Sequence, residues 1–294
     1  MDARGKRERH LSVAKLVSPG TWWMIAAAFG FAVMAAAAKM MPDLPSFEKV
    51  FARSVLSVGI TWWMMRQAGG RFQPKNKSGL FLRAVFGLAG LVCYFEAIQR
   101  IPLGTAVTVY NLTPIFAALI GFTFLGEKIT GKRTLSIFIG IGGVALIKGF
   151  TPSVTWTGVF FALGTALFSA IAYSYVRVLN KTEHPLTIVM AFPLVSIPIS
   201  AALGGMDFRM PTGWEWWWLL ILGLGTQMGQ VCLTHSLRYH TASRATQIGF
   251  VGVVFAMILG TMMGDGLPGW AQVGGAALVF WSLTISPSSK SERR

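Results

Sequence analysis

The chain has 294 residues, of which 53% are hydrophobic and 13% are charged, against about 25% charged in a typical soluble domain. This composition excludes a water-soluble enzyme, and two cysteines exclude a small module held together by disulfide bonds. The net charge of +15 is spread between apolar runs rather than gathered on one face, so we expect no nucleic-acid partner.

Ten apolar runs are long enough to cross a bilayer, which takes about 20 residues per helix. In chain order these runs predict spans at about 20–40, 47–66, 79–99, 104–125, 133–150, 156–177, 185–204, 214–237, 241–264 and 267–286. The connections between them are too short to hold a soluble domain. We therefore expect an all-α integral membrane protein with basic tails at 1–18 and 287–294.

The basic residues predict the orientation of these spans, because Lys and Arg concentrate in cytoplasmic connections. The two tails and the even-numbered connections hold 20 of the 26 Lys and Arg residues. The second connection alone holds five, namely Arg66, Arg71, Lys75, Lys77 and Arg83. We expect a multi-pass protein of the cell inner (plasma) membrane with both termini in the cytoplasm.

The two halves of the chain are similar when one is shifted by 138–139 residues. Residues 90–96 then fall on residues 229–235, and Gly121 falls on Gly260. Each unit holds five spans, an odd number, so the second unit must enter the membrane from the opposite side. We expect two inverted repeats at 19–150 and 151–286, a plan that is common in secondary transporters.

A family resemblance rests on this duplication and on the segment YFEAIQRIPLGTAVTVYNLTPIFAALIGFTFLGEKIT at 94–130. The segment resembles the third helix, short turn, fourth helix and terminal Gly-Glu of the drug/metabolite transporter superfamily, and within it the EamA-type ten-helix carriers. Its counterpart at 240–265 is similar, but Asp265 stands where the first half has Glu127, and no proline matches Pro114.

The resemblance covers about 19–286 and implies a cavity formed mainly by spans 1, 3, 4, 6, 8 and 9. It implies transport of amino acids, drugs or other metabolites, and the profile is compatible with the aromatic amino acid exporter branch. It also implies a small-molecule substrate, contact with membrane lipid and no enzymatic activity. We expect a monomer that needs no cofactor.

Polar side chains within spans mark a candidate pathway, because charged side chains at the bilayer centre cost about 2.5–3.5 kcal/mol and polar ones there are retained for a reason. The fourth span carries a polar stripe at three-residue spacing, and the repeat places a matching stripe on the ninth span. Hydrogen bonds between helices, worth about 0.6–2 kcal/mol each, are the alternative explanation. The expected substrate-binding residues are Thr108, Tyr110, Asn111, Ser169, Tyr173, Gln227, Gln230, Gln247 and Phe250.

Four charged or titratable residues within or near spans are candidates for coupling or gating, namely Arg53, Glu96, His235 and Arg244. Arg53 and Glu96 lie at a similar depth, so we expect that they pair or that Glu96 titrates during transport. A bridge from Glu96 to Arg100, four residues on, is the alternative. No group of His, Cys and Asp has the spacing of a metal site, so no metal is expected.

The sequence as a whole predicts a secondary transporter that moves a small amphipathic metabolite by alternating access, with export of aromatic amino acids as the leading hypothesis. Two alternatives within the same superfamily are transport of S-adenosylmethionine and exchange of nucleotide sugars or organophosphates. Exchange of nucleotide sugars or organophosphates would need several basic groups deep in the cavity. An intramembrane enzyme or a non-transporting receptor would be a different class of protein.

Overall fold

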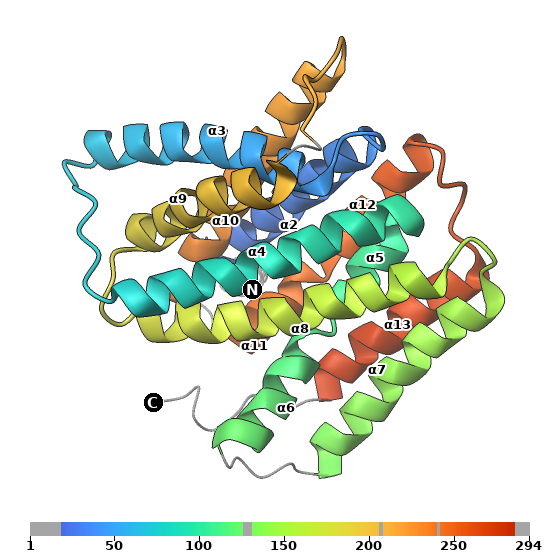
Figure 1. The fold of residues 1–294 in the computed structure, drawn as a ribbon. Helices are drawn as coiled ribbons and strands as arrows, with labels where there is room; N and C mark the ends of the chain where they lie inside the picture. The colour runs from blue at the N-terminus through green and yellow to red at the C-terminus, as the bar shows by residue number, and fades with distance from the viewer. Residues whose placement is uncertain (1–18, 126–130, 206–207, 240–241, 286–294) are drawn as a thin grey trace, which may run out of the picture.

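A computed structural model describes residues 19–125, 131–205, 208–239 and 242–285 (Figure 1). The two expected tails, 1–18 and 287–294, lie outside the described residues. Every regular element in the described part of the chain is an α-helix. The predicted all-α fold is therefore confirmed.

Ten spans are formed within the described residues. Eight of them are single helices: α2 (Pro19–Lys39), α3 (Ser46–Gln67), α4 (Lys77–Arg100), α7 (Gly131–Phe150), α8 (Trp156–Leu179), α9 (Pro185–Gly204), α10 (Glu215–Tyr239) and α13 (Trp270–Ile285). The fourth and ninth spans each consist of two shorter helices. They are α5 (Leu103–Tyr110) with α6 (Thr113–Leu125), and α11 (Ala242–Gly249) with α12 (Val251–Met262).

Four of the described helices, α2, α4, α8 and α9, are long and apolar enough by themselves to cross a membrane by length and composition. The remaining spans differ for visible reasons. The fourth and ninth are broken, and α3 carries both Lys49 and Arg53 in its first two turns. Broken and polar helices at membrane depth are tolerated where they are buried in protein or line a cavity.

The main helix contacts are preserved when the two five-span units are exchanged. Helix α2 packs along α10, and its equivalent α8 packs along α4. Helix α3 packs on its own equivalent α9, and α7 packs on its own equivalent α13. A pseudo-two-fold relation between the units produces this pattern, so the fold is two inverted five-span repeats.

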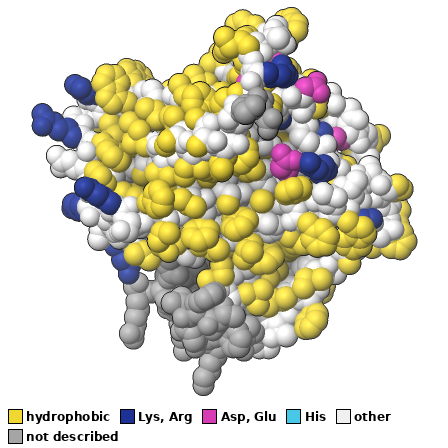
Figure 2. All heavy atoms as spheres, in the orientation of Figure 1, with side chains coloured by type: hydrophobic (Ala, Val, Ile, Leu, Met, Phe, Trp, Pro, Cys, Tyr) yellow, Lys and Arg dark blue, Asp and Glu magenta, His cyan; other side chains and the backbone are white. Residues whose placement is uncertain are grey.

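The surface separates into an apolar middle and two polar ends. Figure 2 shows hydrophobic side chains across most of the visible face, with Lys and Arg gathered at its left edge, where Figure 1 places the connection between α3 and α4. We call the end with connections 67–77 and 179–185 the basic end, and the end with connections 100–103 and 262–270 the opposite end. Exposed tryptophans near the span ends, such as Trp22, Trp62, Trp156 and Trp270, match aromatic membrane-interface belts.

Glycines set the closest approach between helices. A Cβ atom at Gly30 on α2 would lie 2.8 Å from the Gly229 nitrogen and 2.9 Å from the Gly225 oxygen on α10. Only glycine permits two helix backbones to touch in this way. The equivalent contact between α4 and α8 is looser, since a Cβ atom at Gly90 would lie 3.3 Å from the Ser169 hydroxyl oxygen.

Candidate functional site

The fourth span is interrupted between Tyr110 and Thr113. The Asn111 side chain donates to the Val107 carbonyl at 2.7 Å, and the Thr113 hydroxyl donates to the Tyr110 carbonyl at 2.6 Å. Pro114 has no N–H to donate to the Tyr110 carbonyl, and the Thr113 hydroxyl takes the place of this missing donor.

The ninth span is interrupted at Phe250, the position that the repeat aligns with Asn111. No proline lies at this second break, and the sequence did not predict it. Helices α5 and α12 pack against each other, so the two interrupted spans meet. Paired interruptions at corresponding positions of inverted repeats are a common sign of a binding site in carriers.

A cavity of about 540 Å³ lies between the two units. Its volume is in the range of sites for small molecules, about 300–1,000 Å³. All six spans implied by the resemblance contribute to its wall. Two further spans, α3 and α9, add one wall residue each, Arg53 and Phe192, which the resemblance did not imply.

The cavity extends to the basic end of the bundle. Its wall includes Met24 near the start of α2, and it reaches Asn180 and Tyr239, both exposed, just beyond α8 and at the end of α10. None of the described residues that line it lies in the connections of the opposite end. The cavity is therefore accessible from one end of the bundle.

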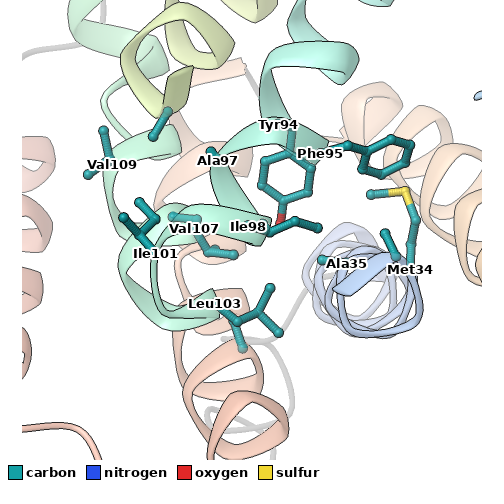
Figure 3. Packing of buried hydrophobic residues seen from close by; sticks show 14 of the residues in the cluster. Met34, Ala35, Tyr94, Phe95, Ala97, Ile98, Ile101, Leu103, Val107 and Val109 are labelled. Carbon is teal, nitrogen blue, oxygen red and sulfur yellow. The ribbon is translucent and has the colours of Figure 1, made fainter. Parts of the chain in front are cut away.

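Packed apolar side chains close the opposite end. Figure 3 shows Tyr94 and Ile98 of α4 close to Val107 of α5, with Leu103 on the following turn toward α2, and Phe95 of α4 beside Met34 of α2. All of these side chains are buried. This layer separates the cavity from the connections of the opposite end.

A polar cluster lies beyond this apolar layer. The Lys39 ammonium is 2.5 Å from an Asp265 carboxylate oxygen and donates to the Ile101 carbonyl at 3.2 Å. The other Asp265 oxygen accepts from the Leu103 nitrogen at 2.8 Å. The cluster thus joins the first, fourth and ninth spans, and it has the position of a gate.

Five of the nine expected substrate-binding residues line the cavity: Tyr110, Asn111, Ser169, Tyr173 and Gln230. The Tyr110 and Tyr173 hydroxyl groups are 2.6 Å apart and hydrogen-bonded, which links α5 of the first unit to α8 of the second. Within the described residues, the Gln230 side-chain amide has no hydrogen-bond partner and is free to meet a ligand.

The other four do not belong to the wall and instead hold helices in place. Thr108 donates to the Gly104 carbonyl at 2.8 Å within its own helix, and Phe250 packs on Phe280. The Gln227 amide donates to the Thr61 hydroxyl at 2.9 Å, and the Gln247 amide donates to the Leu283 carbonyl at 2.9 Å. Helix-to-helix bonding, the alternative explanation of the stripes, accounts for both glutamines.

The four candidate coupling residues are dispersed. Glu96 forms its ion pair with Arg100 and accepts from the Ser46 hydroxyl at 2.6 Å, so the expected pairing with Arg53 was wrong. His235 stacks on Trp23 with ring centroids 5.0 Å apart. The Arg244 side chain lies outside the described residues.

Two buried arginines are the main charged feature of the wall. Arg53 is 2% exposed and Arg83 is 6% exposed, and their guanidinium carbons lie 4.9 and 5.0 Å from the centre of the Phe192 ring. Arg53 donates to the Thr226 hydroxyl at 3.3 Å. Among the described residues neither arginine has an acidic partner.

Sequence reasoning assigned Arg83 to the second connection as an orientation signal. The structure places it in the second turn of α4, turned into the cavity. Its position inside the predicted span 79–99 was the available signal. We had expected Arg83 to belong to the basic connection, and this expectation was wrong.

A cavity between two inverted repeats, reached from one end, with two interrupted spans at its centre, defines the class of membrane transporters built from internal duplication. Comparison with known proteins agrees with this class. The chain belongs to the EamA-like transporter family, whose model matches residues 18–149 and 156–286. This family lies in the drug/metabolite transporter superfamily, as the sequence predicted.

Several relatives are named transporters. The pseudopaline exporter CntI of Pseudomonas aeruginosa is 32% identical over 91% of this chain and 95% of its own length. Solute carrier family 35 member G1 of Mus musculus is 25% identical over 90% of this chain and 77% of its own length. A riboflavin transporter of Brucella anthropi is 27% identical over 70% of this chain and 76% of its own length. These names agree with the expectation that the chain is not an enzyme.

The fold is also found in a solved crystal structure that shares 17% sequence identity. It superposes with a TM-score of 0.61 and covers 88% of this chain and 95% of that chain. At this identity the likeness supports the fold alone.

Proposed function

We propose that the protein exports a small amphipathic metabolite across the inner membrane by alternating access. One observation carries this proposal: the cavity is shared by both repeats, extends to the basic end and is closed at the opposite end. With the basic end and both termini in the cytoplasm, as the distribution of Lys and Arg favours, this is an inward-facing state. The exporter name of the Pseudomonas relative supports the outward direction.

Transport then requires the closed end to open while the basic end closes. Opening must separate Lys39 from Asp265 and part the apolar layer around Leu103 and Val107. A substrate can drive this change only by binding the second state more tightly than the first. The two units, proposed as 19–150 and 151–286, move relative to each other, and one chain encloses the whole cavity, so we propose that a monomer suffices.

The wall favours a substrate with an apolar body and a few polar groups. Apolar side chains such as Phe31 and Leu91 make up most of it, with the Tyr110–Tyr173 pair and Gln230 as hydrogen-bonding groups. Aromatic amino acids fit this apolar and hydrogen-bonding part of the wall, but their ammonium group would face the two buried arginines, so they are tested beside aromatic carboxylates.

An organic anion is the second candidate, and the two buried arginines favour it. Deep basic groups are what exchange of organophosphates or nucleotide sugars needs. They disfavour S-adenosylmethionine, because its sulfonium would face two like charges.

A counterflow experiment in proteoliposomes tests the transport function. Vesicles preloaded with one unlabelled solute are mixed with labelled tracer, and the panel covers aromatic, aliphatic and charged amino acids, aromatic carboxylates and phosphorylated solutes. We expect accumulation of tracer for at least one class, absent from protein-free vesicles. Equal tracer uptake in both kinds of vesicle across the whole panel would contradict the transport proposal.

A further inference from the structure

We propose that Arg53 and Arg83 bind the anionic group of the substrate, so that the cavity selects amphipathic organic anions over zwitterions and cations. This inference rests on the proposed transport function and names its substrate class. The anionic group is a carboxylate or a phosphate, both of which accept paired hydrogen bonds from guanidinium groups.

The first argument is the charge balance of the cavity. A buried charge without a partner is costly, and proteins normally pair it or hydrogen-bond it. The described residues that line the cavity include Arg53 and Arg83 but no Asp or Glu. The ion pairs formed by Glu96, Asp265 and Glu215 lie at the opposite end of the bundle. A bound anion would supply the missing negative charge.

The second argument is the set of unused hydrogen-bond donors. The Nε atoms of Arg53 and Arg83 and the Nη1 atom of Arg83 are buried and have no hydrogen-bond partner among the described residues. Such orphaned donors are rare in folded proteins, and each costs about 1–3 kcal/mol. Three of them in two wall residues leave both guanidinium charges poorly compensated, and a bound anion would reduce that deficit.

The third argument is the way the two arginines are held. Both guanidinium groups lie about 5 Å from the centre of the Phe192 ring, whose face attracts cations. Gly87, one turn after Arg83, makes room for this ring, since a Cβ atom there would lie 2.9 Å from the ring edge. One aromatic ring therefore gathers two like charges from α3 and α4, an arrangement that an anion between them would stabilise.

The remaining wall explains why the anion should be amphipathic. Apolar side chains of four helices, Phe31, Leu91, Val107 and Leu233, line the same cavity. They bury a hydrophobic body, whereas the arginines bind its charged end. A zwitterion would bring an ammonium group into a cavity that already holds two cations and, among its described lining residues, no carboxylate.

A charge series on one apolar body tests this selection. The full chain is placed in nanodiscs of phosphatidylcholine, a lipid without net charge, and binding is measured by isothermal titration calorimetry. The probes are 3-phenylpropionate, phenethyl phosphate, phenylalanine, phenethylamine and 2-phenylethanol. We expect at least one of the two anions to bind about tenfold or more tightly than phenylalanine, and phenethylamine to bind most weakly. Phenylalanine or phenethylamine binding as tightly as both anions would overturn the proposal.

Substitutions then locate the binding of the anion. Arg53→Gln and Arg83→Gln should each weaken binding of the preferred anion about tenfold or more, whereas Arg53→Lys and Arg83→Lys should retain part of it. Arg66→Gln is the matched control, because Arg66 lies on the same helix as Arg53 but is exposed and stacks on Trp62. Unchanged anion binding in both glutamine variants would overturn the proposal.

Two readouts separate this inference from loss of fold and from failure of the transport function. Binding of neutral 2-phenylethanol should survive in every folded variant, and where a glutamine variant does not fold the lysine variants decide. If the anion binds but no solute shows counterflow, the transport proposal fails and the binding site stands. If counterflow occurs for neutral or cationic solutes but not for anions, the binding proposal fails and the transport function stands.

Discussion

Lys39 at the end of α2 and Asp265 after α12 form an ion pair of 2.5 Å that joins the two repeats at the closed end of the bundle. Asp265 is the residue that the repeat places opposite Glu127, which lies outside the described residues. The pair is mostly buried, with side chains 17% and 14% exposed. Substitution of either residue therefore tests whether this ion pair keeps the opposite end closed.

Asp265→Asn should loosen this end, because the substitution removes the charge that Lys39 needs while keeping an acceptor for Leu103. A partly buried pair contributes about 1–3 kcal/mol, which is about a fivefold to 150-fold change in the population of open states. Hydrogen–deuterium exchange of residues 101–106 should accelerate accordingly. Glu96→Gln is the control, since the Arg100 ion pair and the Ser46 hydrogen bond of Glu96 both lie within the first unit, so the contact between units and this exchange should be unchanged. Equal rates in Asp265→Asn and the unaltered protein would exclude the gate.

Gln230→Ala should reduce substrate affinity about fivefold to tenfold without lowering the melting temperature, because its amide faces the cavity and has no partner in the described part of the chain. Gln247→Ala should instead lower the melting temperature and leave substrate affinity unchanged. The Gln247 amide donates to the Leu283 carbonyl, so the loss of this hydrogen bond should cost about 1 kcal/mol of stability. Transport kinetics and thermal unfolding of both variants check this contrast, which fails if the two glutamines behave alike.

Tyr173→Phe should destabilise the protein by about 0.5–1.5 kcal/mol, because the partly buried Tyr110 hydroxyl loses its partner. Tyr110→Phe should have a similar effect. The double substitution should cost less than the sum of the two, since no orphaned hydroxyl remains. Thermal unfolding of the four proteins measures this coupling, and strictly additive effects would show that the hydroxyl pair contributes nothing.

Gly30→Ala should destabilise the fold by about 1–3 kcal/mol, because its methyl group would meet backbone atoms of Gly225 and Gly229 that cannot rotate away. Gly59→Ala on α3 is the matched control, since nothing lies within 4 Å of a Cβ atom there. Replacing a helical glycine at such an open site should be neutral or stabilising. Melting temperatures of the two variants in detergent should move in different directions or by clearly different amounts.

The ten spans could be predicted because each depends on a local property, a run of apolar residues of membrane length. The repeat followed from comparing the chain with itself. The break at Phe250 was not predicted, since no proline lies there and Gly249, where α11 ends, is a residue that membrane helices often contain.

The site was predicted in part, and the errors have a common cause. Gln227 and Gln230 lie three residues apart on α10, yet one bonds Thr61 and the other lines the cavity. Which side of a helix faces the cavity depends on its neighbours, which periodicity does not supply. Arg83 was missed for a related reason, because a charge near a span end was assumed to point toward water rather than inward.

The tight contact of Gly30 with Gly229 has a counterpart that differs by one residue. A shift of 139 positions carries Gly30 to Ser169 and Gly229 back to Gly90, so the second copy holds a serine where the first holds a glycine. That hydroxymethyl group keeps α8 farther from α4 and faces the cavity. The two halves therefore differ in how closely their helices approach: backbone meets backbone where α2 packs on α10, whereas a hydroxyl group lies between α4 and α8 and adds a hydrogen-bonding group to the cavity wall.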